Sequence, residues 1–126
     1  MNTLLKIDNV MFCVSNLEKA AQFYEDVLGL ERVWTDKEQG MIGFVFQGSD
    51  SEIVIHNDSS IPNPSFSFSV KDVQKFCDEY RKKGYAVVRE PFDVRCGKFA
   101  VLADPEGNEL PIVDLTKFNN KPRYHE

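Results

Sequence analysis

The second half of this chain repeats the pattern of the first half, and this repeat restricts its fold more than any other feature. Val14 and Val70 are 56 positions apart (70 − 14), and the same offset separates Tyr24 from Tyr80. An internal repeat of this length indicates two structural units of one kind. Neither unit alone is expected to cover both faces of a small sheet, so we expect the two to fold together.

Each half predicts a strand, a helix and three further strands. In the first half, the strands are predicted where apolar residues follow strand-like patterns: 7–14, 31–36, 41–47 and 52–57. In the second half, the same criterion gives 66–70, 85–89, 98–103 and 110–115. Ser15 and Glu18 form a capping-box pattern that predicts the first helix start, and Gly29 and Gly84 are placed to end the two helices.

Residues 58–64 are the clearest break in the chain. They read Asp-Ser-Ser-Ile-Pro-Asn-Pro, and the two prolines oppose a regular element. We therefore predict a single domain over residues 1–126, with a first module at about 5–58, a linker at 58–64, a second module at about 65–115 and a C-terminal tail at 116–126.

Composition excludes several classes of function. The 126 residues include 15 Lys and Arg against 20 Asp and Glu, and the net charge of -5 disfavours nucleic acid as a partner. No apolar run approaches the roughly 20 residues that span a bilayer, and the first 14 residues show no signal-peptide pattern. Cys13, Cys77 and Cys96 form no CxxC pair, so we expect free thiols and a cytoplasmic location.

Four stretches carry a family resemblance. Residues Ile7–Val10, Ser15–Ala20 and Phe23–Leu30 resemble the opening module of the vicinal oxygen chelate superfamily, and Asp104–Leu110 resembles its closing hairpin. That superfamily includes glyoxalase I, bleomycin-resistance proteins and extradiol dioxygenases. The resemblance covers about residues 5–115. It implies an α+β fold in which two βαβββ modules form an open, eight-stranded, cup-shaped mixed sheet, and it implies a homodimer.

The same resemblance implies where a metal ion would be held. In metal-dependent members, His, Glu or Gln on the first and last strand of each module bind a divalent ion. The matching positions here are Asn9, Val54, Ser65 and Pro111. Val and Pro offer no lone pair, and Asn and Ser are weak ligands for a transition metal. We therefore expect no metal and no other cofactor, which disfavours glyoxalase and dioxygenase chemistry.

Alternation along the strands predicts which side chains line the cup. Val10, Phe12, Phe66 and Phe68 are expected under the helices, so the residues between them should point the other way. Aromatic side chains could form walls that stack on a planar ligand. The predicted ligand-binding residues are Asn9, Met11, Trp34, Phe44, Phe46, His56, Ser65, Ser67 and Arg95.

Each candidate also has a purely structural interpretation. The aromatic residues could equally be core, although Trp34 is favoured for the wall because charged Arg32 and Asp36 share its alternating face. The serines could face solvent on a half-exposed strand, and Arg95 could belong to a solvated loop rather than a cationic gate.

His56 and Glu109 are the two catalytic candidates. His56 could bind a ligand or transfer a proton, or it could be an exposed residue at a strand end. Glu109 could point into the cup or end a hairpin in water.

Three functions remain open from the sequence. The leading hypothesis is a metal-free homodimer that binds a small organic molecule, with antibiotic sequestration of the bleomycin-resistance type as the nearest analogy. The net negative charge suits a cationic ligand. The first alternative is an enzyme (a lyase, isomerase or dioxygenase) with a displaced metal site that uses His56 and Glu109. The second alternative is a dimeric scaffold without a ligand.

Overall fold

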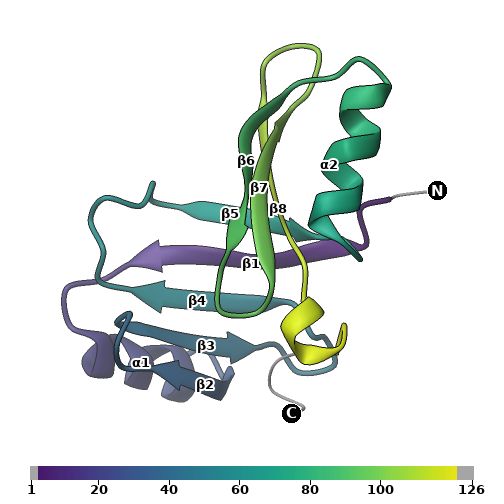
Figure 1. Ribbon diagram of the computed structural model, residues 1–126. Helices are drawn as coiled ribbons and strands as arrows, with labels where there is room; N and C mark the ends of the chain where they lie inside the picture. The colour runs from purple at the N-terminus through teal and green to yellow at the C-terminus, as the bar shows by residue number, and fades with distance from the viewer. Residues whose placement is uncertain (1–2, 122–126) are drawn as a thin grey trace. The chain divides into compact units, whose positions relative to one another are not determined.

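The predicted order of elements occurs twice in the protein. A computed structural model describes residues 3–121 (Figure 1). The elements of the first half are β1 (Lys6–Cys13), α1 (Leu17–Asp26), β2 (Glu31–Asp36), β3 (Met41–Val45) and β4 (Glu52–His56). Those of the second half are β5 (Ser65–Ser69), α2 (Val73–Lys82), β6 (Val87–Asp93), β7 (Lys98–Ala103), β8 (Glu109–Val113) and a 3-10 helix (Thr116–Phe118). Eight strands with parallel and antiparallel pairs and two helices confirm the predicted fold class.

The chain divides into two compact units. The first unit is Asp8–Phe66, and the second is formed by the chain from Ser67 onward together with the segment that ends at Ile7. The Leu5 N–H donates to the Ser69 carbonyl at 2.9 Å, which explains why this early segment belongs to the second unit.

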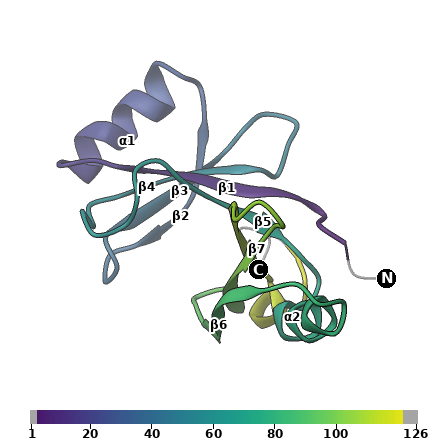
Figure 2. The same cartoon turned by 90° about the horizontal axis from the view of Figure 1, so that it is seen from above.

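The first unit is a four-stranded sheet with one helix. Its strand order is β2-β3-β4-β1, in which β1 and β4 are parallel and the other neighbours are antiparallel. In Figure 2, α1 lies along one side of these strands. The core between α1 and the sheet contains Ala21 of the helix and Ile42, Phe44 and Ile55 of the strands. The opposite face of the sheet is therefore the one on which a site can form.

The second unit has the same topology, with the order β5-β8-β7-β6. The core between α2 and the sheet consists of Val73 and Cys77 of the helix together with Val70, Ala100, Leu102 and Ile112. A second apolar cluster consists of Cys96, Val113 and Leu115, with Val94, Phe99 and Phe118 packed against them. Val113 follows Ile112 in β8, and because Ile112 packs under α2, Val113 points to the opposite face. Apolar side chains therefore pack on both faces of this unit.

The two helix starts correspond, but the predicted cap was wrong by one residue. Asn16, not Ser15, caps α1, because its side chain accepts a hydrogen bond from the Lys19 N–H at 3.0 Å. Asp72 caps α2 in the same way through the Lys75 N–H. Ser and Asn are both good caps, so residue type alone could not choose between neighbouring positions.

Strand β6 was predicted to end at residue 89, and this was wrong. The strand runs from Val87 to Asp93 and includes Pro91. β6 is an edge strand of its unit and its pairing with β7 is irregular at two places, and both features accommodate a proline that cannot donate to a neighbour. Phe66 is also not under a helix, since it is 41% exposed.

The part of the chain that the structure describes contains no helix long and apolar enough to cross a membrane. The predicted tail begins with the 3-10 helix, whose Lys117 N–H donates to the Cys96 carbonyl at 3.0 Å. Residues 122–126 of that tail lie outside the described residues.

Candidate functional site

The face of the first unit that points away from α1 carries most of the predicted site. We call it the non-helix face. Ile53 and Ile55 of β4 pack under α1, so the residues that alternate with them in β4 point to the other face of the sheet. The β1 residues paired with those alternating residues point to that same face. The β1 and β4 members of this face are the pairs Asn9 with Glu52, Met11 with Val54, and Cys13 with His56.

Trp34 reaches this face because of an irregularity in β2. The pairing with β3 shifts between Arg32 and Trp34, so that Arg32 lies opposite Phe44 and Trp34 lies opposite Gly43. The prediction that Arg32 and Trp34 share a face was therefore wrong, since a bulge breaks the alternation. Arg32 instead bonds two carboxylates of α1, Glu18 at 2.8 Å and Glu25 at 2.7 Å.

Gly43 provides the space that the indole occupies. A Cβ atom at position 43 would collide with the Trp34 ring. The indole Nε1–H then donates to Glu52 Oε2 at 2.8 Å, and Glu52 is only 2% exposed. The ring therefore crosses β3 and is tied to β4, which fixes an aromatic surface on the non-helix face.

His56 is the most informative residue of the site. It is completely buried, and its Nδ1 accepts the Asp58 backbone N–H at 3.1 Å. That bond assigns the ring proton to Nε2. The Nε2 atom has no hydrogen-bond partner within residues 3–121. Burial lowers the pKa of His56 below its ordinary value, although the Asp58 carboxylate acts in the opposite direction, so the ring is neutral near pH 7.

Asn9 offers the complementary group. Its amide nitrogen donates to Asp8 Oδ2 at 2.8 Å, but its buried Oδ1 accepts nothing within the described residues. A buried polar atom without a partner costs about 1–3 kcal/mol. Asn9 and His56 are separated by four residues along paired strands, or about 13 Å. The His56 Nε2–H donor and the Asn9 Oδ1 acceptor therefore lie at opposite ends of the face.

Several predicted residues do not lie on this face. Phe44 is a correction: it is fully buried under α1 and stacks on Tyr24 with ring centroids 5.7 Å apart. Phe46 comes directly after the end of β3 and is 43% exposed. Both lie an even number of residues from Ile42, which faces the helix, so alternation already opposed placing them with Val54.

The remaining candidates lie elsewhere in the chain. Ser67 is buried on β5, Arg95 places its guanidinium 5.8 Å from the Phe118 ring, and Glu109 is exposed at the start of β8. Ser65 begins β5 and is partly exposed. The non-helix face therefore holds four predicted ligand-binding residues, Asn9, Met11, Trp34 and His56, together with Val54, one of the predicted metal-ligand positions.

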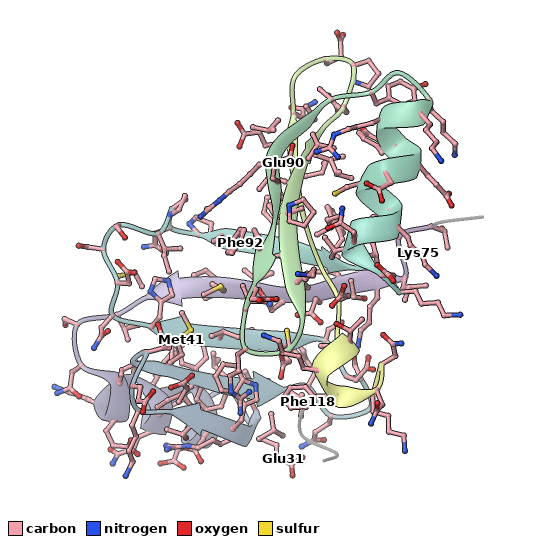
Figure 3. The ribbon with its side chains drawn as sticks, in the orientation of Figure 1. Glu31, Met41, Lys75, Glu90, Phe92 and Phe118 are labelled. Atoms are coloured by element: carbon pink, nitrogen blue, oxygen red, sulfur yellow. The ribbon has the colours of Figure 1, made fainter. Side chains whose placement is uncertain are left out.

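Glu52 and Met41 were not predicted as members of the non-helix face, whereas Cys13 lies on the predicted face of Asn9 and Met11 but was not named as a site residue. Met41 is opposite His56 in the ladder of β3 and β4 and is labelled in Figure 3. A signal for Glu52 was present, because it lies two residues before Val54 on a strand whose other face is apolar. A charged residue on a strand that is otherwise buried is a functional candidate.

One hollow of about 210 Å³ lies in the second unit. Its lining residues are Phe76, Glu79, Tyr80, Lys83 and Tyr85. None of these five side chains has a buried polar atom without a partner. The non-helix face of the first unit is therefore the better candidate for a specific ligand.

Comparison with known proteins decides the family. A sequence model of the Glyoxalase/Bleomycin resistance protein/Dioxygenase superfamily matches residues 6–112. The chain belongs to this superfamily. A probable lactoylglutathione lyase of Synechocystis sp. (strain ATCC 27184 / PCC 6803 / Kazusa) is 31% identical over 86% of this chain and 94% of its own length. A lactoylglutathione lyase of Neisseria meningitidis is 27% identical over 95% and 98%.

Solved structures show the same fold. Methylmalonyl-CoA epimerase from Mycobacterium tuberculosis has a TM-score of 0.62 at 21% identity, with 87% of each chain covered. The Mn(II)-bound glyoxalase from Novosphingobium aromaticivorans has a TM-score of 0.61 at 20% identity, and the match covers 89% of this chain and 39% of that one. At these identities the likeness supports the fold and not the activity.

The divalent ion that the family implies does not fit the residues at its usual positions. Val54 is 2% exposed on the non-helix face, between Met11 and Gly43, and it has no donor atom. Pro111 of β8 lies opposite Val101 of β7, and its side chain also has no donor atom for a metal. Within residues 3–121, no group of three or more His, Cys, Asp or Glu side chains is placed to hold a metal ion.

Proposed function

We propose that this protein binds a small organic molecule on the non-helix face of the first unit without a metal ion. The observation that carries the proposal is the buried His56 Nε2–H, which has no acceptor among residues 3–121. A ligand oxygen at this atom would recover the free energy that burial of the donor costs. Trp34 supplies a flat apolar wall, and Asn9 Oδ1 accepts a ligand N–H or O–H.

The charge of the chain favours a cationic or neutral ligand over an anionic one. The net charge is -5, and Glu52 places a carboxylate group on the same face as His56. A planar molecule with a carbonyl group and a basic substituent meets these requirements. Sequestration of an antibiotic of this kind in the cytoplasm is the specific form of the function that we propose.

A thermal-shift screen of antibiotics and small metabolites tests the proposal. A ligand at one hundred times its Kd should stabilise the protein by about 2.7 kcal/mol. Trp34→Ala should weaken the binding of that ligand by about 1–3 kcal/mol if the ring stacks on it. Phe66→Ala is the matched control, because it removes another partly exposed aromatic side chain and should leave the Kd unchanged.

Enzymatic activity is the second candidate, because relatives at 31% and 27% identity are named as lactoylglutathione lyases. In this alternative, His56 would donate its Nε2 proton to a substrate oxygen, and a metal would be held away from the usual positions. Elemental analysis of protein purified without chelators separates the two. One tightly bound Zn, Ni, Fe or Mn per chain would contradict the metal-free proposal.

We also propose a homodimer. Phe23, Val27 and Leu28 are 50%, 67% and 51% exposed near the end of α1, and β2 is an unpaired edge of its unit. Light scattering from micromolar to millimolar concentration should give twice the mass of one chain. A dimer that binds nothing in the screen would favour the scaffold alternative.

A further inference from the structure

On the non-helix face, a cysteine lies next to His56, whose Nε2 atom has no hydrogen-bond partner within the described residues. Cys13 and His56 are register partners in the parallel ladder of β1 and β4. Paired residues of neighbouring strands point to the same side of a sheet. The Val14 N–H donates to the His56 carbonyl at 2.7 Å, and the Cys13 N–H donates to Asn63 Oδ1 at 3.2 Å, so the backbone around both residues is held in place.

Cys13 differs from the other two cysteines in its access to solvent. Cys13 is partly exposed, whereas Cys77 is fully buried and Cys96 is 5% exposed. Burial also raises the pKa of the Cys77 thiol, which disfavours its reactive thiolate form. A reagent that enters the non-helix face would therefore meet one thiol.

The neighbouring imidazole is arranged to donate a proton in a hydrogen bond. Because Nδ1 already accepts the Asp58 N–H, the proton lies on Nε2. A buried N–H without an acceptor is a site for an oxygen that gains negative charge during a reaction. Met41, the β3 neighbour of His56, is a flexible side chain that can move aside for a ligand.

We propose that Cys13 adds covalently to α,β-unsaturated carbonyl compounds, with His56 Nε2–H donating to the carbonyl oxygen. The sulfur forms a bond to the β-carbon as the carbon–carbon π bond breaks, and the electron pair moves to the oxygen as an enolate. The thiol proton is released to solvent and a proton returns to the α-carbon, so the adduct contains every atom of both reactants. No oxidant or reductant is required.

Intact-mass spectrometry and peptide mapping after treatment with 2-cyclopenten-1-one test the proposal. We expect one adduct per chain, located on Cys13, and none in Cys13→Ser. His56→Leu should slow the addition about tenfold or more, as expected for loss of a donor to a developing oxyanion. His56→Gln retains an N–H donor and should recover part of the rate.

Iodoacetamide provides the control for a merely structural effect. Its reaction displaces iodide and develops no enolate, so His56→Leu should leave its rate at Cys13 nearly unchanged. Equal slowing with both reagents, or labelling of Cys77 or Cys96 in place of Cys13, would overturn the proposal. The reversible binding proposed above is tested separately, because Cys13→Ser removes the adduct and retains Trp34, Asn9 and His56.

Discussion

The two units of this protein share one topology but complete their non-helix faces differently. The Val14 N–H donates to the His56 carbonyl at 2.7 Å, and the Val70 N–H donates to the Val113 carbonyl at 2.9 Å. His56 and Val113 are therefore equivalent positions. Val113 packs into an apolar cluster, whereas His56 is buried with an N–H that has no partner within the described residues.

The next pair of equivalent residues shows the opposite arrangement. Asp114 is 1% exposed, and its carboxylate accepts hydrogen bonds from Val73 N–H, Lys98 N–H and both the N–H and the hydroxyl of Thr116, at 2.7–3.3 Å. Asn57 at the matching position is exposed. A buried polar group with all its partners holds its own unit together. A buried polar group without a hydrogen-bond partner indicates that a molecule from outside the unit supplies that partner.

The largest effect should come from removing the carboxylate of the second unit. Asp114→Ala leaves several buried donors without an acceptor and should lower the free energy of unfolding by about 4 kcal/mol. Urea denaturation measures this change. Asn57→Ala, the equivalent change in the first unit, should stay within about 0.5 kcal/mol because that side chain is exposed. Equal losses would remove the distinction between the units.

A smaller effect of opposite sign is expected at His56. His56→Leu makes the first unit resemble the second, because an apolar side chain replaces a donor that has no partner within residues 3–121. The variant should be more stable by about 1 kcal/mol, because the cost of the buried Nε2–H exceeds that of losing the bond from Asp58. Differential scanning calorimetry should show the higher Tm, while ligand affinity falls. A destabilised variant would mean that His56 is a structural residue.

The smallest effect should be the pH dependence that His56 contributes. Its pKa is lowered in the folded state, so the unfolded chain binds a proton first as the pH falls below about 6.5. The wild type should therefore lose stability between pH 7.5 and the lower folded pKa, and His56→Leu should lose less over this range. Urea unfolding at several pH values measures the difference.

The carboxylate of Asp58 titrates in a separate range. The hydrogen bonds from the Ser60 hydroxyl and N–H lower the pKa of Asp58. The stability that these bonds give is lost only as the pH falls below about 3.9. An identical pH profile for wild type and His56→Leu above pH 5 would show that the histidine is not responsible.

The repeat and the hydrophobic patterns determined most of the fold. The offset of 56 in the sequence predicted equivalent strands and helices, and Asn16 and Asp72 cap the two helices at that same offset. These features depend on local backbone preferences and on which side chains avoid water. Local signals therefore predicted both units and their order.

The site depended on tertiary contacts that the sequence could not specify. The bulge in β2 turns Trp34 away from Arg32, and the missing Cβ of Gly43 lets the indole reach Glu52. A single irregular pair reverses the face of every residue after it, so alternation alone fails there. The wrong placement of Phe44 beside the ligand is a different case, because its even spacing from Ile42 already predicted the position under α1 that it occupies.

The sequence by itself determined the family, the two βαβββ units and the weakness of Asn9, Val54, Ser65 and Pro111 as metal ligands, because these follow from residue type and spacing. Only the tertiary structure decided that His56 is buried next to Cys13 and opposite Met41, with an Nε2–H that has no partner in the described part of the chain. Burial and hydrogen bonding are properties of neighbours brought together from distant parts of the chain. A residue's own place in the sequence does not contain them.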